Sequence, residues 1–296
     1  MREDIQFDAN GTTLRGWFYT PETPARPYPT VILAHGFSAL KEMGLNRYAE
    51  AFAAGGLACL VYDNRNLGAS DGEPRDEIDP VAQMRDYRHA VTYALNRSDV
   101  DGDRIGIWGT SYTGGLVLIA AATDRRVKCV VSQVPEIHGN ESAKRSNTPE
   151  SMRERMQMID DERRSLHAGH APHTVAVCVH DPSQAASSPG NRTYEFFHSF
   201  DSEDEFSWPN RVTVRSLELR FEYDALAYAD RVSPTPLLMI VAGDDEITPT
   251  DLAMTAYDRA LEPKKLHIIT GDHYRPYIDA FEESSSVARA WFTAHL

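Results

Sequence analysis

The feature of the sequence that most constrains its fold is a series of short apolar runs that alternate with segments of helical periodicity. The runs are too short for helices and lack polar alternation, which is typical of parallel strands buried on both faces. Their alternation with helices predicts an α/β fold, in which right-handed crossovers place helices on both faces of a mostly parallel central sheet. The expected strands are residues 31–34, 57–62, 104–108, 127–134, 237–243 and 265–270, and the expected helices are 45–54, 81–95, 116–122, 251–261 and 277–292.

The alternation stops between residues 137 and 230, where the chain is polar and rich in Ser, Asn, Arg and His. We interpret this segment as a cap inserted into a core domain of residues 1–136 and 231–296. Within the cap, residues 182–210 contain Pro, Ser, Asn and acidic clusters, and we expect them to form a loop.

One helix of the cap is expected to begin at Thr148-Pro149, because a capping residue is followed there by Pro in the first turn. Met152, Met156 and Ile159 then recur at helical spacing. Since Met side chains adapt to irregular apolar surfaces, Met152 and Met156 are candidates for the lining of a substrate pocket. Simple helix packing is the alternative role.

The strongest chemical motif is GTSYTG at residues 109–114, which follows an expected strand and precedes an expected helix. A nucleophile elbow needs this context, because a strained turn then projects the Ser hydroxyl above the sheet. The usual pattern is G-x-S-x-G, whereas here Thr113 stands at the second Gly position and Gly114-Gly115 follow. Ser111 is the candidate nucleophile, and an ordinary strand-to-helix turn that contains a Ser is the alternative.

A Ser hydroxyl is a weak nucleophile until a base accepts its proton. His273 directly follows the last expected strand, and a loop in that place lies at the same edge of the sheet as the elbow. His273 is therefore the candidate base.

The acid that orients the base should follow the preceding strand, where Asp244, Asp245 and Glu246 are consecutive. We select Asp245 for its spacing to the Thr-Pro pair that follows. Asp244 and Glu246 are the near alternatives, and Glu136, after an earlier strand, is a more distant one.

Two backbone N–H groups are expected to form an oxyanion hole, which stabilises negative charge on the substrate oxygen. One belongs to Tyr112, the residue after the nucleophile. The other is assigned to Phe37 in the loop after the first central strand, where the N–H and not the ring is the working part. Gly36 would let that backbone turn close to the site.

The composition limits the classes of partner and the cellular compartment that we expect. Lys and Arg total 30 against 44 Asp and Glu, and the formal net charge of −14 would repel nucleic acid. Three sparse cysteines fit a reducing compartment. No apolar stretch approaches the roughly 20 residues of a membrane span, and no signal peptide is evident, so we expect a cytoplasmic protein without a membrane partner. A homodimer is compatible with the sequence.

The sequence does not favour a metal site. His167, His170 and His173 lie close together, but Pro172 interrupts the helix and no acidic or Cys ligand is suitably spaced. The sequence also contains no Gly-rich phosphate loop. We therefore expect neither a metal nor another cofactor.

These residues resemble the α/β-hydrolase superfamily over about residues 1–136 and 225–296. The segment VYDNRNLGASDG, at residues 61–72, is similar to its D-x-R-x-x-G-x-S-x-G segment, which implies that Asp63 and Arg65 hold the loop beside the active site. The stretches AHGFSALKE, VYDNRNLGASDGEPR and GTSYTGG look like a subgroup that includes thiohydrolases and acyl-transferring enzymes of fungal polyketide pathways. The Ser-Tyr pair of the elbow is also similar to the cocaine-esterase and X-Pro-dipeptidyl-peptidase branch. The chain order Ser, Asp, His agrees with the superfamily and differs from other serine hydrolases.

Together the motifs predict a serine hydrolase that acts on a small-molecule ester, thioester or lactone through an acyl-enzyme on Ser111. Acyl transfer to an alcohol or amine is the nearest alternative, because it uses the same catalytic residues. A different reaction on the same fold, such as carbon–carbon cleavage, and a non-catalytic binding protein are the others.

Overall fold

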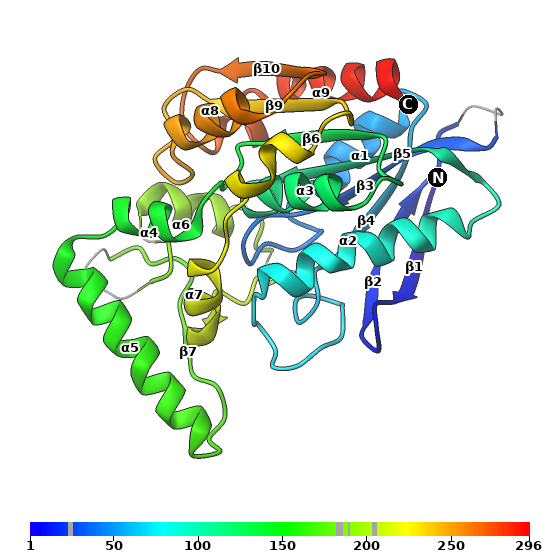
Figure 1. Cartoon of the computed structure of the whole chain (residues 1–296). Coiled ribbons are helices and arrows are strands. Elements are labelled where there is room, and N and C mark those ends of the chain that lie inside the picture. The colour runs from blue at the N-terminus through cyan, green and yellow to red at the C-terminus, as the bar shows by residue number, and fades with distance from the viewer. Residues whose placement is uncertain (23–25, 182–185, 189, 203–205) are drawn as a thin grey trace.

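The centre of the molecule is an eight-stranded sheet with the strand order β1-β2-β4-β3-β5-β6-β9-β10 (Figure 1). The computed structural model describes residues 1–22, 26–181, 186–188, 190–202 and 206–296. β2 pairs antiparallel with β1 and with β4, and every pair from β4 to β10 is parallel, so the expected mostly parallel α/β sheet is confirmed. The strands are β1 (Arg2–Asp8), β2 (Thr13–Tyr19), β3 (Tyr28–Ala34), β4 (Ala58–Tyr62), β5 (Val100–Thr110), β6 (Cys129–Gln133), β9 (Leu237–Ala242) and β10 (Lys264–Ile269).

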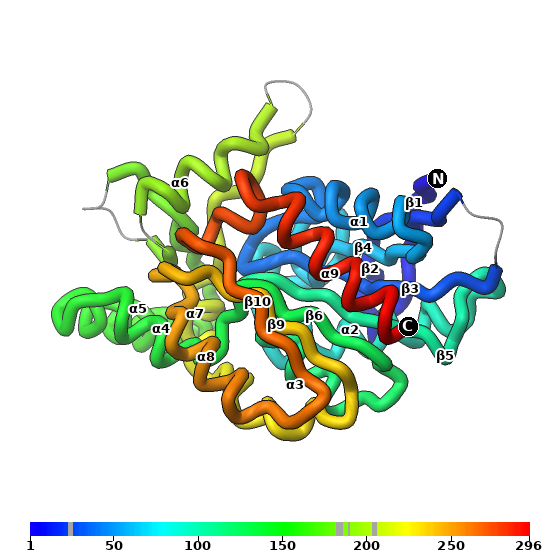
Figure 2. Tube along the Cα trace, turned by 90° about the horizontal axis from the view of Figure 1, so that it is seen from above, coloured from blue at the N-terminus to red at the C-terminus, as the bar shows by residue number. Residues whose placement is uncertain are grey.

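Helices cover both faces of this sheet (Figure 2). One face carries α1 (Leu45–Ala53) and α9 (Phe281–His295), and the other carries α2 (Pro80–Leu95), α3 (Tyr112–Thr123) and α8 (Thr250–Arg259). Successive residues of a strand point to opposite faces. In β3, Val31 and Leu33 therefore pack on the α1 side and Ile32 packs on the α3 side. Burial on both faces explains why the sequence shows continuous apolar runs.

The parallel strands bring the candidate site residues to one edge of the sheet. Phe37 follows β3, Ser111 follows β5, Asp245 follows β9 and His273 follows β10. The carboxyl ends of parallel strands share one edge, so loops far apart in the chain meet there.

Residues 137–230, which we call the cap, add no strand to the eight-stranded sheet among the residues that the structure describes. The 3-10 helix η1 (Leu226–Arg231), where the cap ends, packs against α3 and α8 of the core. The other elements of the cap are α4 (Gly139–Arg145), α5 (Pro149–His167), β7 (Thr174–Val175), α6 (Asn191–His198), β8 (Val212–Thr213) and α7 (Val214–Phe221).

Helix α5 begins where the sequence indicates. Thr148 accepts a hydrogen bond from the Ser151 N–H, and Pro149 occupies the first turn. The helix projects away from the sheet at the lower left of Figure 1. None of the helices in the described part of the chain, α5 included, combines the length and the hydropathy that a membrane crossing requires.

The expectation that residues 182–210 form a loop is wrong for α6. This helix has no side-chain cap at its start, since Gly190 is its N-cap, so the usual start signal is absent. Packing of its aromatic side chains holds it instead: the ring of Phe196 lies 4.5 Å from that of Tyr274, and the ring of Phe197 lies 4.4 Å from that of Trp208. The short helix α4 is a second element that the polar composition of the cap does not predict.

A buried carboxylate ties the loop after β3 to the sheet. Asp63, directly after β4, is fully buried and accepts hydrogen bonds from the N–H and the ammonium group of Lys41, at 2.8 and 2.7 Å. Burial opposes its ionisation, but contact with the His35 ring and the charge of Lys41 outweigh burial and hold the pKa of Asp63 below its usual value. Arg65 forms an ion pair with the buried Asp86 of α2. Asp63 and Arg65 thus anchor this region, as the resemblance implies.

We expect Asp63→Ala to lower the free energy of unfolding by about 3 kcal/mol, because it removes the buried partner of the Lys41 ammonium group. Urea denaturation monitored by circular dichroism measures this change. The control is Asp71→Ala, which removes an exposed carboxylate paired with Arg15 and should leave the stability close to wild type. Equal, small effects of both substitutions would contradict the anchoring role of Asp63.

Candidate active site

Ser111 stands at the turn between β5 and α3, and its backbone is strained, with φ 55° and ψ −121°. A residue with a side chain rarely adopts a positive φ unless its surroundings hold it there. The Ser111 N–H donates to the Gln133 carbonyl at 2.9 Å, and the Ser111 carbonyl accepts from the Glu136 N–H at 2.8 Å. These two bonds to the end of β6 fix the turn, which has the strand-turn-helix context of a nucleophile elbow.

Thr113 fits the position where the usual motif has Gly, because its hydroxyl is used locally. The side chain is fully buried, and its Oγ1 donates to the Ala34 carbonyl at 2.8 Å. The close approach of α3 to β6 falls on the next two residues instead. A Cβ at Gly114 would lie 2.7 Å from a carbonyl oxygen of β6, and one at Gly115 would clash with the carbonyl of Glu136. The two glycines after Thr113 therefore do the work of the single Gly in the usual pattern.

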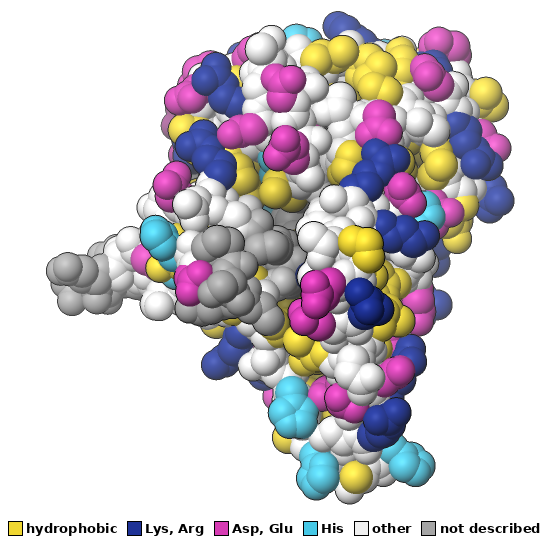
Figure 3. Space-filling model, turned by 90° about the vertical axis from the view of Figure 1, so that its left-hand side faces the viewer, with side chains coloured by type: hydrophobic (Ala, Val, Ile, Leu, Met, Phe, Trp, Pro, Cys, Tyr) yellow, Lys and Arg dark blue, Asp and Glu magenta, His cyan; other side chains and the backbone are white. Residues whose placement is uncertain are grey.

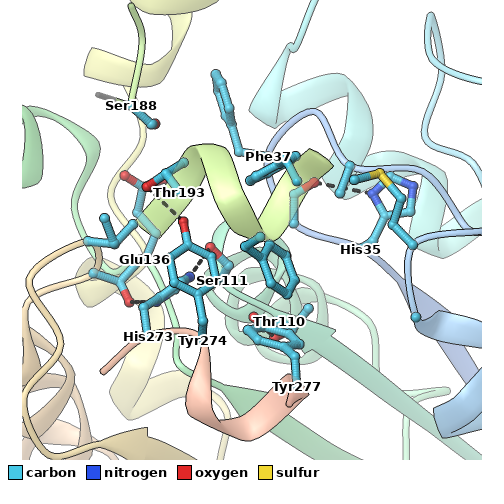
Figure 4. Close-up of a pocket in the computed structure, with 18 of the residues that line it drawn as sticks. His35, Phe37, Thr110, Ser111, Glu136, Ser188, Thr193, His273, Tyr274 and Tyr277 are labelled. Atoms are coloured by element: carbon cyan, nitrogen blue, oxygen red, sulfur yellow. Dashed lines mark hydrogen bonds between the residues drawn. The ribbon is translucent and has the colours of Figure 1, made fainter. Parts of the chain in front are cut away.

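His273 connects Ser111 to Asp245 through two hydrogen bonds. The Ser111 Oγ lies 3.1 Å from Nε2 of His273, and Nδ1 of His273 lies 2.7 Å from Oδ2 of Asp245. Figure 4 shows Ser111 and His273 pointing toward one another. His273 and Asp245 are both buried. In this arrangement Nε2 can accept the Ser111 proton while Nδ1–H remains bonded to the carboxylate, which is how an imidazole activates a hydroxyl.

The three consecutive acids after β9 are placed differently from one another. Asp244 and Glu246 are exposed, whereas the Asp245 side chain is buried. Oδ1 of Asp245 accepts the N–H groups of Ile247 and Thr248 at 2.9 and 2.8 Å, which leaves Oδ2 directed at His273. Of the near alternatives, Asp245 is thus the acid in contact with the imidazole.

Glu136, the distant alternative, has a different partner. Its carboxylate is buried and accepts from Arg220 of α7, whose Nε lies 2.8 Å from Oε1. Arg220 also lies over the ring of Phe37, with 5.2 Å between the guanidinium carbon and the ring centroid. Glu136 therefore joins the cap to the core beside Ser111 through its ion pair with Arg220.

Thr248 is a residue that sequence analysis used only as a spacing marker. Its hydroxyl lies 2.9 Å from Oδ2 of Asp245, 3.0 Å from the Val134 carbonyl and 3.2 Å from Nδ1 of His273. A hydroxyl in this place can orient both the carboxylate and the ring. The Thr-Pro spacing was the available signal, but only the fold reveals the contact.

The segment that carries Phe37 lies alongside Ser111. A Cβ at Gly36 would lie 3.0 Å from the Ser111 Cβ, so Gly is needed for this approach. The Phe37 N–H has no acceptor among the described residues. Tyr112 is the first residue of α3, where helical N–H groups lack an intrahelical partner. Its side chain points into the core and bonds Gln83 of α2, which leaves the N–H as its available group.

Ser111 and His273 border a cavity of about 70 Å³ between the core and the cap. Most of its lining is aromatic or aliphatic, and the hydroxyl of Tyr274 bonds the Thr193 hydroxyl of α6 at 2.9 Å (Figure 4). Burial raises the pKa of Tyr277, so its phenol stays neutral. The lining includes Phe37, Trp108 and Tyr277 from the core and Val177, Phe196 and Phe197 from the cap.

Met152 and Met156 do not line this cavity, which corrects the expectation that they form the pocket. Both lie on α5, which projects from the body of the molecule, and the Met156 side chain is 41% exposed. The helix packs against α7 through Ile159 and Met158, whereas Met152 and Met156 take no part in that contact. Helix α6 supplies the cavity wall, and the adjacent aromatic residues Phe196 and Phe197 were the available signal.

His167, His170 and His173 are exposed near the C-terminal end of α5, and histidine side chains gather at the lower tip in Figure 3. His173 bonds the Glu162 carboxylate at 2.7 Å. Within the described ranges, no three potential metal-ligating side chains come together.

Known proteins share this architecture. A family model described as alpha/beta hydrolase fold matches residues 29–277. A thiohydrolase of Eupenicillium brefeldianum is 30% identical over 274 residues, which cover 91% of this chain and 86% of that protein. The polyketide transferase grgF of a Penicillium species is 28% identical over 286 residues, which cover 96% and 92% of the two chains. The crystal structure of the alpha/beta hydrolase GrgF from Penicillium sp. sh18 matches with a TM-score of 0.86 at 27% identity, over 100% of this chain and 99% of that one.

The geometry predicts which of the neighbouring carboxylates matters for kcat, measured with an activated aryl ester as substrate. We expect Asp245→Asn to lower kcat by about 10⁴-fold, because an amide would hold His273 in the wrong tautomer. Asp244→Asn should leave kcat close to wild type, since that carboxylate is exposed. The reverse ranking would transfer the role to Asp244, and a null effect of both would transfer it to Glu136.

Proposed function

Because this chain belongs to the α/β-hydrolase family, we propose that it is a serine hydrolase that cleaves a carboxylic ester, a thioester or a lactone. The observation that carries the proposal is the hydrogen-bonded chain from Ser111 through His273 to Asp245 beside a largely apolar cavity. The apolar lining suits an acyl group, and the buried imidazole suits proton transfer to and from a hydroxyl.

The proposed reaction has two halves. In the first, His273 takes the Ser111 proton as Oγ attacks the carbonyl carbon, and the N–H groups of Phe37 and Tyr112 hold the resulting oxyanion. Asp245 stabilises the imidazolium, which then protonates the leaving alcohol or thiol as the bond to it breaks. In the second half, His273 deprotonates a water molecule that attacks the acyl-enzyme, and the proton returns to Ser111 as the acid leaves.

The leaving group sets the substrate class. An alcohol or thiol leaves more readily than an amine, which demands more from the general acid, so esters and thioesters are favoured over amides. The name of the thiohydrolase relative supports a thioester, and both relatives span most of this chain.

We expect a fluorophosphonate probe to label Ser111 covalently, because Oγ is the hydroxyl bonded to the base. Mass spectrometry of the labelled peptide locates the adduct. Ser111→Ala should abolish labelling and lower kcat by about 10⁴- to 10⁶-fold. Labelling that persists in Ser111→Ala, or activity within about tenfold of wild type, would remove Ser111 from the mechanism.

Acyl transfer is the second candidate, in which an alcohol or amine replaces water. The observation that favours it is the similarity to a polyketide transferase over 96% of this chain. Both reactions share Ser111, His273 and Asp245 and differ only in what attacks the acyl-enzyme. The acidic chain, with its net charge of −14, would repel an acidic carrier protein, so we propose water as the acceptor.

Partition of the acyl group separates hydrolysis from transfer. The protein is supplied with an activated ester and increasing concentrations of alcohols and amines, and chromatography quantifies the products. We expect free acid to dominate at about millimolar acceptor, a level typical of substrate binding. Saturable capture of most acyl groups by one acceptor would show that this acceptor binds specifically, and the protein would then be a transferase.

A further inference from the structure

A second cavity, of about 510 Å³, adjoins the one beside Ser111. The two cavities share Ser188, Arg220 and Ile247 in their walls, so they meet at the junction of the cap and the core. Figure 3 views the molecule from its left-hand side, where acidic, basic and hydrophobic side chains are interspersed on the surface. Inside the second cavity, positive and negative side chains balance one another less evenly than they do on this surface.

Arg155 of α5 lines this second cavity and is the unusual group in its wall. Arg155 is only 8% exposed, and one of its guanidinium nitrogens donates to the backbone carbonyl of Ala186 at 3.1 Å. The hydrogen bonds of Arg155 go to backbone carbonyls, and no carboxylate of the described residues lies within ion-pair distance of it. Carbonyl dipoles satisfy hydrogen bonds but do not neutralise a charge.

The neighbouring charges do not supply the missing partner. Arg220 is buried against Glu136, and this pair is neutral as a unit. Arg145, in the same wall, is ion-paired with Glu141 and Asp251. Among the residues that the structure describes, one uncompensated positive charge therefore remains in the buried part of the wall, at Arg155.

That charge persists at neutral pH. Burial, and to a lesser extent repulsion by Arg220, lowers the pKa of Arg155 to about 10, so the guanidinium stays protonated. A buried, unpaired cation is costly, and proteins normally pair such groups or place a ligand against them. A planar guanidinium matches the two oxygens of a carboxylate.

Two carboxylates in the same cavity limit the charge of the ligand. Asp245 and Glu246 also line the cavity, and the former is engaged by His273 while the latter is exposed. These acids disfavour a dianion such as phosphate. Ser188 adds a hydroxyl group to the same cavity, which suits a single carboxylate, whereas the Ser187 hydroxyl donates to the Val177 carbonyl.

We propose that the second cavity is a carboxylate subsite, in which Arg155 binds a carboxylate of the substrate remote from the bond that is cleaved. The inference rests on the proposed function, since it names a feature of the ester or thioester that Ser111 attacks. The carboxylate could belong to the acyl chain or to the leaving group, and both placements use the same chemistry at Arg155.

Matched substrate pairs test the subsite. On the acyl side, 4-nitrophenyl hydrogen suberate is compared with the same ester whose far end is a primary amide. On the leaving-group side, the octanoyl ester of 4-hydroxybenzoate is compared with that of 4-hydroxybenzamide. We expect wild type to favour the carboxylate about tenfold or more in kcat/KM in one pair, the typical gain from a hydrogen bond to a charged group.

The variants assign that preference to one residue. Arg155→Met should bring the preference close to one, and Arg155→Lys should retain part of it, because the charge remains but the planar fork is lost. Arg153→Met, which removes an exposed guanidinium from the same helix, is the control and should retain the full preference.

A binding measurement separates this inference from the proposed hydrolysis. Free suberate should raise the melting temperature of wild type and of Arg153→Met, and the shift should be lost in Arg155→Met. If none of the four esters is hydrolysed but this shift is found, the subsite stands and the hydrolase proposal fails. If hydrolysis occurs with no Arg155-dependent preference in either pair and suberate gives no shift, the subsite is overturned. A shift with phosphate and none with suberate would also overturn it.

Discussion

The strained backbone of Ser111 is the constraint on which the rest of the site depends. A positive φ at a residue with a side chain costs about 1–3 kcal/mol, and the surrounding structure has to impose it. Here β6 does so through its carbonyl and through the N–H of Glu136, while Gly114 and Gly115 let α3 approach closely enough to keep the turn tight. The loop after β10 then places His273 within hydrogen-bond distance of the projected Ser111 hydroxyl.

Glu136 couples this turn to the cap. Its N–H fixes the Ser111 carbonyl, and its carboxylate holds Arg220, which lines both cavities. The position of the hydroxyl and the position of the cap wall therefore both depend on Glu136, three residues after the end of β6. A shift of α7 would also move the turn at Ser111, because the Glu136–Arg220 ion pair is buried and its partners have little freedom to separate.

Sequence alone predicts a mostly parallel sheet and the meeting of Ser111, Asp245 and His273, because short apolar runs indicate parallel strands whose carboxyl ends share one edge. It does not predict α6, whose start lacks a capping side chain and whose stability comes from tertiary contacts of Phe196 and Phe197. The choice among three consecutive acids was likewise open, since backbone hydrogen bonds within a turn decide which carboxylate faces inward. Local sequence patterns are enough to predict the sheet, whereas the pocket depends on contacts between segments that are distant in the chain.

The charged residues of α5 show the same limit of prediction from sequence. Arg153 and Arg155 are two positions apart and thus about 200° apart around the helix, so one is exposed and the other buried. The helical spacing of Met152 and Ile159 marks the face on which Arg155 lies, but the spacing does not reveal which groups lie opposite that face. Packing against the rest of the cap buries Arg155, and no described residue supplies a counter-charge. Because a ligand that binds the folded state stabilises it, a carboxylate at Arg155 would offset the cost of that buried charge, and substrate binding would be coupled to the stability of the cap.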